Sequence, residues 1–193
     1  MAMSSDEAQP PKPPASTPTA EDALLDTELE QTFPASDPLP WTHDAPDHEL
    51  YLEDFRVGRR FVTATLDVTA SEIKSFAAQF DPQPFHLDEE AARRSVFGSL
   101  AASGWHTASM TMRLLVTSHM RVPGGLVGLG GEISWPRPTY AGDVLRVEVE
   151  VVDAKRSRSK PDRGVVTLRP ETKNQRGEVV QSALIKILVP SRG

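Results

Sequence analysis

The sequence contains no cysteine, which excludes disulfide bridges, thiolate metal ligands and a cysteine nucleophile. It also contains no apolar run close to the roughly 20 residues that a membrane-spanning helix needs. The first residues, Met-Ala-Met-Ser-Ser-Asp-Glu, form neither a basic segment nor an apolar one, so they do not resemble a secretory signal. From these absences we expect a soluble, cytoplasmic protein that has no membrane partner.

Basic residues are almost missing from the start of the chain. Residues 1–48 hold ten acidic residues, a single basic residue (Lys12) and nine of the 17 prolines. This composition offers little apolar surface to offset the entropy cost of ordering the chain. We therefore predict a disordered, acidic, Pro-rich tail over 1–48, in which the spacing of leucines permits one short helix at 22–33. The remaining residues carry a net charge of +3, which is too weak to indicate a nucleic-acid partner.

Residues 49–193 have the patterns of one folded α+β domain. Thr69 and Glu72 form a capping box that predicts a short helix over Ala70–Gln79. Ala101–Thr117 is apolar nearly all round, which predicts a helix buried on most sides. Alternating apolar residues predict strands over Arg60–Thr69, Glu132–Trp135, Val144–Ala154, Gly164–Lys173 and Glu178–Val189. Long strands after one central helix indicate an antiparallel sheet wrapped around that helix.

An acid and an imidazole lie five residues apart between the two predicted helices. Asp81 and His86 flank Pro82 and Pro84, which stiffen the predicted loop that carries them. A carboxylate beside an imidazole that titrates near neutral pH is suited to general acid–base work. Each residue also has a structural interpretation, Asp81 as a turn residue before a proline and His86 as a cap of the following helix.

The start of the Ala101–Thr117 helix offers a second chemical group. Gly104 permits close approach of a ligand, and a helix N-terminus presents backbone N–H groups that favour negative charge. Ser103 is expected to cap this helix or to orient Asp81. His106 is interpreted as a hydrogen-bonded histidine of the core, the alternative being a catalytic group, and Trp105 as a residue of the core or of an acyl pocket.

The run Phe80-Asp81-Pro82-Gln83-Pro84-Phe85-His86 resembles the signature Gly-Asp-x-Asn-Pro-x-His of the MaoC-like dehydratases, also called (R)-specific enoyl-CoA hydratases. Asp, Pro and His keep the family's spacing, while Phe80 and Gln83 replace its Gly and Asn. The run Ala102-Ser103-Gly104-Trp105-His106 resembles the start of the family's central helix. Trp135-Pro136-Arg137-Pro138 and Ala141-Gly142-Asp143 fit its later strands. The resemblance covers about residues 51–190.

This resemblance implies a hot-dog fold and a hydratase or dehydratase that acts on acyl-CoA thioesters. Water would add across the double bond of a trans-2-enoyl-CoA to give an (R)-3-hydroxyacyl-CoA, or leave in the reverse reaction. Asp81 and His86 would activate the water, and the N–H of Gly104 would stabilise the thioester oxygen. We expect the substrate to be bound by Ser103, Trp105, Gln83, Phe85, Arg156 and Arg158. We expect no metal and no cofactor, coenzyme A being only part of the substrate. The resemblance further implies a homodimer.

Two other functions are compatible with the same sequence. The replacements Phe80 and Gln83 favour a module that binds acyl-CoA without catalysis. A hot-dog thioesterase would need an acidic or polar activating group on the central helix, and Ala101–Thr117 contains neither Asp nor Glu. The basic run Lys155–Arg163, which holds Arg156 and Arg158, is typical of solvated surface, the alternative being contact with the phosphates of coenzyme A.

Overall fold

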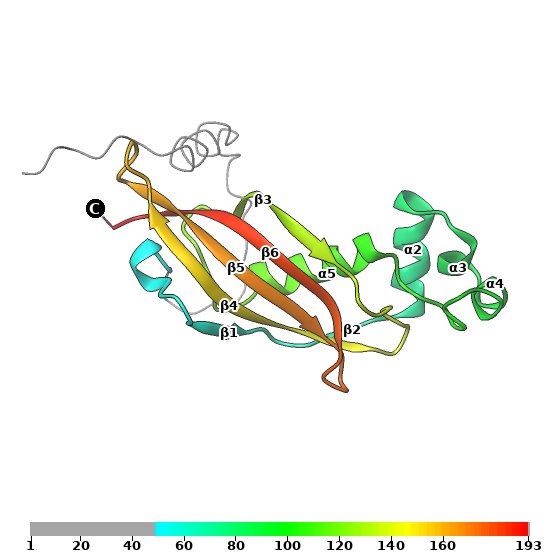
Figure 1. Ribbon diagram of the computed structural model, residues 1–193. Coiled ribbons are helices and arrows are strands. Elements are labelled where there is room, and N and C mark those ends of the chain that lie inside the picture. Colours follow the sequence, from blue (N-terminus) through cyan, green and yellow to red (C-terminus); the bar gives the residue numbers. More distant parts are fainter. Residues whose placement is uncertain (1–48, 193) are drawn as a thin grey trace, which may run out of the picture.

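The computed structural model describes residues 49–192, so the predicted tail over 1–48 and its helix at 22–33 lie outside the described residues. After a short 3-10 helix, η1 (Leu52–Asp54), the chain forms β1 (Arg60–Val62) and β2 (Leu66–Asp67). Four helices follow and four strands complete the fold (Figure 1). The helices are α2 (Ala70–Phe80), α3 (Pro84–Leu87), α4 (Glu89–Arg93) and α5 (Gly104–Val116), and the strands are β3 (Val127–Ser134), β4 (Val144–Arg156), β5 (Arg163–Lys173) and β6 (Val179–Pro190).

The strands form one antiparallel sheet in the order β1-β4-β5-β6-β3, and β2 also pairs with β4. Leu145, Val147, Val149 and Val151 are buried and alternate with more exposed residues of β4, as their spacing predicts. They belong to one core with Met110, Leu114 and Leu115 of α5. The predicted α+β arrangement, with a sheet packed on one long helix, is therefore present, and Figure 1 shows α5 running behind the strands.

Three predicted elements differ from the structure. The predicted strand Arg60–Thr69 is interrupted, because the hydroxyl of Thr63 accepts a hydrogen bond from the backbone N–H of Val147 and replaces a ladder bond. The predicted loop of His86 contains the helix α3, which begins at Pro84. Strand β3 begins at Val127 instead of at the predicted Glu132, so it includes Gly128, Gly130 and Gly131. A Cβ on Gly131 would lie 2.3 Å from the carbonyl oxygen of Leu184.

The helix α5 is buried on one side only. Trp105, Met112 and Val116 are exposed by 61, 48 and 49 %, and they recur at helical spacing along one face. The prediction of burial on most sides is therefore wrong for this face. In the described part of the chain, no helix is long and apolar enough to cross a membrane.

Candidate active site

Asp81 and His86 lie side by side, because α3 begins directly after α2 ends. Asp81 is the C-terminal cap of α2, and His86 lies in the single turn of α3. The Nε2 atom of His86 is 3.4 Å from Oδ2 of Asp81. The His86 side chain is only 5 % exposed and that of Asp81 19 %. The spacing in the sequence thus brings a buried imidazole onto a partly buried carboxylate.

The hydrogen bond of His86 fixes which ring nitrogen carries a proton. Nδ1 lies 2.7 Å from the carbonyl oxygen of Ala101, and a carbonyl only accepts, so Nδ1 carries the hydrogen. In the neutral ring, Nε2 is then an acceptor that faces the acceptor oxygens of Asp81. Two converging acceptors suit a molecule that donates twice, and water is the simplest such molecule.

Several contacts hold Asp81 in its charged form. Burial alone would raise the pKa of Asp81, but hydrogen bonding by the Ser103 hydroxyl and the Gln83 amide, and the positive charge of His86 whenever that ring is protonated, bring the pKa below its usual range. Nε2 of Gln83 donates to Oδ1 of Asp81 at 2.7 Å. Asp81 is therefore a carboxylate at neutral pH and can accept hydrogen bonds only.

Ser103 joins this carboxylate to the start of α5. Its hydroxyl oxygen accepts a hydrogen bond from the N–H of Trp105 at 3.2 Å, and the same hydroxyl helps to lower the pKa of Asp81. Ser103 is the N-terminal cap of α5, so its predicted capping role is present. Gly104 is the first residue of the helix, where the geometry provides no partner four residues earlier for its N–H.

Gly104 also has a packing role, which the sequence of the chain does not reveal. A Cβ on Gly104 would lie 2.9 Å from Cδ2 of the Trp135 indole, so the ring occupies the space that a side chain would need. Trp135 also packs edge-on against Trp105, with ring centroids 5.4 Å apart. The contact of Trp135 with Gly104 was not predicted, and no local pattern could reveal it because the two residues are 31 positions apart.

Phe85 reaches the candidate site, but the two predicted arginines do not. The Phe85 ring packs edge-on against His86, with centroids 4.6 Å apart. Arg156 lies at the end of β4, whose 13 residues span about 40 Å, and it pairs with Glu53 at 2.5 Å. Figure 1 shows the β4–β5 hairpin, which also carries Arg158, at the opposite end of the sheet from α2, α3 and α4. Within one chain, Arg156 and Arg158 are therefore separate from Asp81 and His86.

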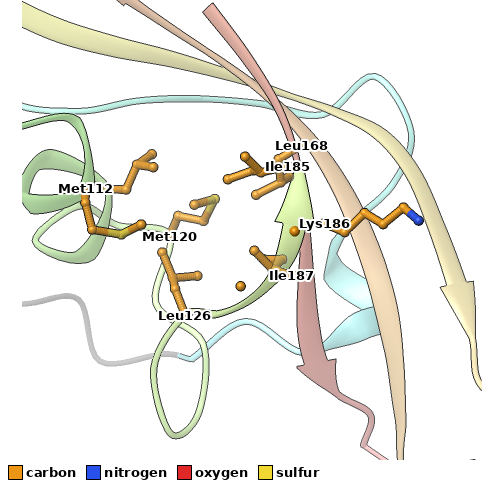
Figure 2. Close-up of a pocket in the computed structure, with 10 residues that line it drawn as sticks. Met112, Met120, Leu126, Leu168, Ile185, Lys186 and Ile187 are labelled. Atoms are coloured by element: carbon orange, nitrogen blue, oxygen red, sulfur yellow. The ribbon is translucent and has the colours of Figure 1, made fainter. Parts of the chain in front are cut away.

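An apolar cavity of about 290 Å³ lies at the other end of α5. Figure 2 shows Met112, Met120, Leu126 and Ile187 around this cavity, with the charged end of Lys186 pointing away from it. Met112 is eight residues from Gly104, or about 12 Å along the helix axis. The cavity is therefore separate from the Asp81–His86 pair.

Comparison with known proteins identifies the family to which this chain belongs. The MaoC like domain matches residues 54–174, which include the Asp81–His86 pair and the whole of α5. The chain belongs to the MaoC-like domain family. A MaoC-like dehydratase from Rhodospirillum rubrum of known structure is 58 % identical, with a TM-score of 0.73, over 75 % of this chain and 99 % of its own. This similarity confirms the hot-dog fold that the sequence predicted.

Two other relatives are less similar to this chain. The uncharacterized protein YdeM of Bacillus subtilis is 30 % identical over 72 % of this chain and 97 % of its own length. An (R)-specific enoyl-CoA hydratase of Rhodospirillum rubrum is 29 % identical over 74 % of this chain and 94 % of its own. The family is thus one of hydratases and dehydratases together with members of unassigned activity.

Proposed function

We propose that this protein adds water to a trans-2-enoyl-CoA to give an (R)-3-hydroxyacyl-CoA, or catalyses the reverse dehydration. The observation that carries the proposal is the pair of acceptors formed by Nε2 of His86 and the Asp81 carboxylate, 3.4 Å apart. Its similarity to the (R)-specific enoyl-CoA hydratase supports the same reaction class. Coenzyme A enters only as part of the substrate, and the reaction needs no metal or other cofactor.

In the proposed reaction, a single water donates one hydrogen bond to Asp81 and a second hydrogen bond to His86. As the water oxygen bonds to C3, its proton passes to this pair and the electrons of the double bond move toward the thioester carbonyl. The proton then returns from the pair to C2, so that one water has been added and no other reactant is consumed. The Asp81 carboxylate only accepts hydrogen bonds, while the imidazole of His86 can take up the proton on Nε2 and release it again.

The developing charge on the thioester oxygen is assigned to the N-terminus of α5. The first N–H groups of a 13-residue helix point out of its end and favour negative charge, so the Gly104 N–H is the proposed donor. Ser103, the cap of this helix, also helps to lower the pKa of Asp81, which supports a shared site for the water and the thioester. Trp105 and Phe85 are proposed to contact the acyl-CoA beside them.

Gln83 bears on the alternative of a non-catalytic acyl-CoA-binding module. The amide of Gln83, which stands where the family signature has Asn, donates to Asp81 at 2.7 Å. The carboxylate thus has an amide donor despite the replacement. Phe80, in place of Gly, is 68 % exposed and lies outside the contacts that hold Asp81.

We also propose that the protein is a homodimer. Strand β3 is at the edge of the sheet and is largely exposed on both faces, so its backbone and its apolar side chains both lack cover within the described chain. Ile133 and Trp135 add to the exposed apolar face of α5. A second copy of the chain would cover this surface.

The test is the hydration of crotonyl-CoA and longer trans-2-enoyl-CoA esters by the full chain, followed as loss of the enoyl absorbance. We expect turnover of at least one ester, with the (R) configuration of the product established by chiral chromatography. Binding of these esters without turnover at any chain length would instead support the non-catalytic module. Release of free coenzyme A without a hydroxyacyl product would support the thioesterase.

A further inference from the structure

The indole ring of Trp135 lies against the residue that carries the proposed oxyanion donor. Trp135 directly follows β3, and a Cβ on Gly104 would lie 2.9 Å from both Cδ2 and Cε2 of the indole and 3.3 Å from Cε3. These three atoms belong to the six-membered part of the indole, so this part of the ring covers the α-carbon of Gly104. A displacement of the ring therefore changes the space that holds the first residue of α5.

A buried hydrogen bond fixes the orientation of this ring. The Nε1–H group of Trp135 donates to Oε1 of Gln181 at 2.9 Å, and Gln181 is only 2 % exposed. The amide of Gln181 is held in turn, because its Nε2 donates to the hydroxyl of Thr111 at 3.1 Å. An indole has a single N–H donor, so a ring anchored through it cannot turn without leaving the buried oxygen of Gln181 unpaired.

The segment 135–139 holds the start of α5 at two further points. The carbonyl oxygen of Thr139, a buried residue, accepts a hydrogen bond from the N–H of Ala102 at 2.8 Å. The hydroxyls of Thr139 and Thr107 lie 3.1 Å apart. Contacts with Ala102, Gly104 and Thr107 thus come from one short segment after β3, and together they bracket the N-terminus of the helix.

On the side of α2, the first turn of α5 is held by a stacking contact. The ring of His106 stacks on that of Phe76, with centroids 4.7 Å apart and planes 9° apart. Nδ1 of His106 is fully buried and has no hydrogen-bond partner among the described residues, so the expectation of a hydrogen-bonded core histidine is wrong for this atom. Stacking is less directional than a hydrogen bond, so the bonds of the segment 135–139 are the more directional restraint on this turn.

We propose that Trp135, oriented by Gln181, is a positioning residue for the N–H of Gly104 that binds the thioester oxygen. This inference rests on the proposed function and assigns two further residues to the same site. A hydrogen bond weakens steeply as its angle and distance depart from the optimum, so a small displacement of the helix end weakens the bond to that oxygen. The loss is largest in the transition state, in which the oxygen carries the most negative charge.

The first experiment measures this hydrogen bond without turnover. The probe is butyryl-CoA labelled with carbon-13 at the thioester carbonyl, because this ester has no double bond to hydrate. Infrared difference spectra of the full chain with labelled and unlabelled ester give the carbonyl stretching frequency of the bound ester. A hydrogen bond to the oxygen weakens the C=O bond, so with the wild type we expect a frequency below that of the free ester. Gln181→Leu should lose much of this shift, because the indole loses its acceptor.

The second experiment measures the hydration of crotonyl-CoA. Gln181→Leu and Trp135→Phe remove the bond between indole and amide from its two ends. We expect each variant to lower kcat by ~10-fold or more, with little change in KM, because the donor is misplaced while the rest of the binding site is intact. Gln181 is buried, so its replacement leaves unaltered the exposed apolar residues that are proposed to join two copies.

Val189→Ala is the matched control for a general loss of stability. Val189 is fully buried on the same strand as Gln181, eight residues or about 26 Å along β6. Its truncation should lower Tm, as Gln181→Leu does, and yet leave the carbonyl frequency and kcat of the folded protein at their wild-type values.

Three results would overturn the inference: a wild-type carbonyl frequency and kcat in Gln181→Leu and Trp135→Phe, a rise in KM at unchanged kcat, or an equal loss of the shift in Val189→Ala. If circular dichroism shows that Gln181→Leu does not fold, Trp135→Phe decides the matter, because it keeps an aromatic ring and leaves β6 unaltered. A wild type that binds butyryl-CoA without lowering its carbonyl frequency, or that does not hydrate crotonyl-CoA, would count against the proposed function itself.

Discussion

The proposed site depends on a few backbone positions just before α5 as much as on its acid and base. The carbonyl of Ala101 holds Nδ1 of His86 at 2.7 Å, and Ser103, two residues later, helps to lower the pKa of Asp81. Ala102 is fixed in turn by its N–H, which donates to the carbonyl of Thr139 at 2.8 Å. One short segment therefore sets the orientation of both side chains relative to the helix N-terminus.

Replacing either member of the pair should stop hydration without unfolding the protein. We expect Asp81→Asn and His86→Ala each to lower kcat by ~10²-fold or more, the usual contribution of a positioned acid–base group. Asn keeps the shape of Asp81 but not its charge, and Ala removes Nε2. The measurement is steady-state hydration of crotonyl-CoA, with circular dichroism as the test of folding.

The matched controls are Asp67→Asn and His119→Ala, which alter exposed residues of the same types. Both should have wild-type kinetics. If Asp81→Asn and His86→Ala were as active as these controls, the assignment of the water-activating pair would be wrong.

The lowered pKa of Asp81 predicts how its contribution to stability changes with pH. A carboxyl whose pKa is lower in the folded state than the unfolded value of about 3.9 stabilises the fold above that value, and this contribution disappears as pH falls through the folded pKa. The difference in Tm between wild type and Asp81→Asn should therefore be largest near neutral pH and shrink toward pH 3. A difference that stayed constant from pH 7 to pH 3 would contradict this origin.

The sequence reveals the acid–base pair but not the environment of each residue. Asp81 and His86 are recognisable because their spacing and prolines are local features, and the capping role of Ser103 follows from its position before an apolar run. The unpaired nitrogen of His106 depends on what α2 places beside it. The contact of Trp135 with Gly104 likewise depends on packing between distant segments.

At the scale of elements, a buried polar network fixes α5 on the sheet. The hydroxyl of Thr111 on α5 lies 2.6 Å from that of Thr172 on β5 and accepts from the amide of Gln181 on β6 at 3.1 Å. Gln181 also accepts from the indole N–H of Trp135 at 2.9 Å. Because Trp135 lies on Gly104, this network connects the sheet to the proposed oxyanion donor.

Breaking the network at its centre should destabilise the fold. Gln181→Leu removes a 2 % exposed side chain that bonds to both Thr111 and Trp135, and it leaves the indole N–H unpaired. We expect the free energy of unfolding in urea to fall by about 1–3 kcal/mol. Gln79→Leu, on the exposed surface of α2, is the control and should change it little. Equal stability of the two variants would show that the network contributes no net stabilisation.

Elements with strong local signals are predicted well, and those set by distant partners are not. The capping box of Thr69 and Glu72 is present, and α2 extends only one residue beyond its predicted end. Asp88 caps α4 by accepting a hydrogen bond from the N–H of Ala91. The break in the first predicted strand arises from the bond of Thr63 to β4, and β3 includes its glycines because β6 approaches them closely. In both cases the partner strand, β4 or β6, is far away in the sequence.

On the scale of the whole molecule, exposed apolar residues of α5 lie beside exposed apolar residues at the end of β3. We call this the α5–β3 surface; its members are Trp105, Met112, Val116, Ile133 and Trp135, each at least 37 % exposed. An edge strand combined with large apolar side chains is a liability for a monomer, because it can pair with other chains. A specific partner would remove this liability.

The proposed homodimer can be tested by placing charge on the α5–β3 surface. We expect wild-type protein to have the mass of two chains in light scattering after size-exclusion chromatography. Ile133→Lys combined with Val116→Lys should give the mass of one chain, because buried unpaired charges oppose association. Val57→Lys, at a 69 % exposed apolar residue outside the α5–β3 surface, should remain dimeric. A wild type with the mass of one chain, or a double variant that stayed dimeric, would show that this surface does not join two copies.

Since Trp105 and Trp135 of this surface lie beside Gly104, we also expect the monomeric variant to hydrate crotonyl-CoA more slowly than Val57→Lys.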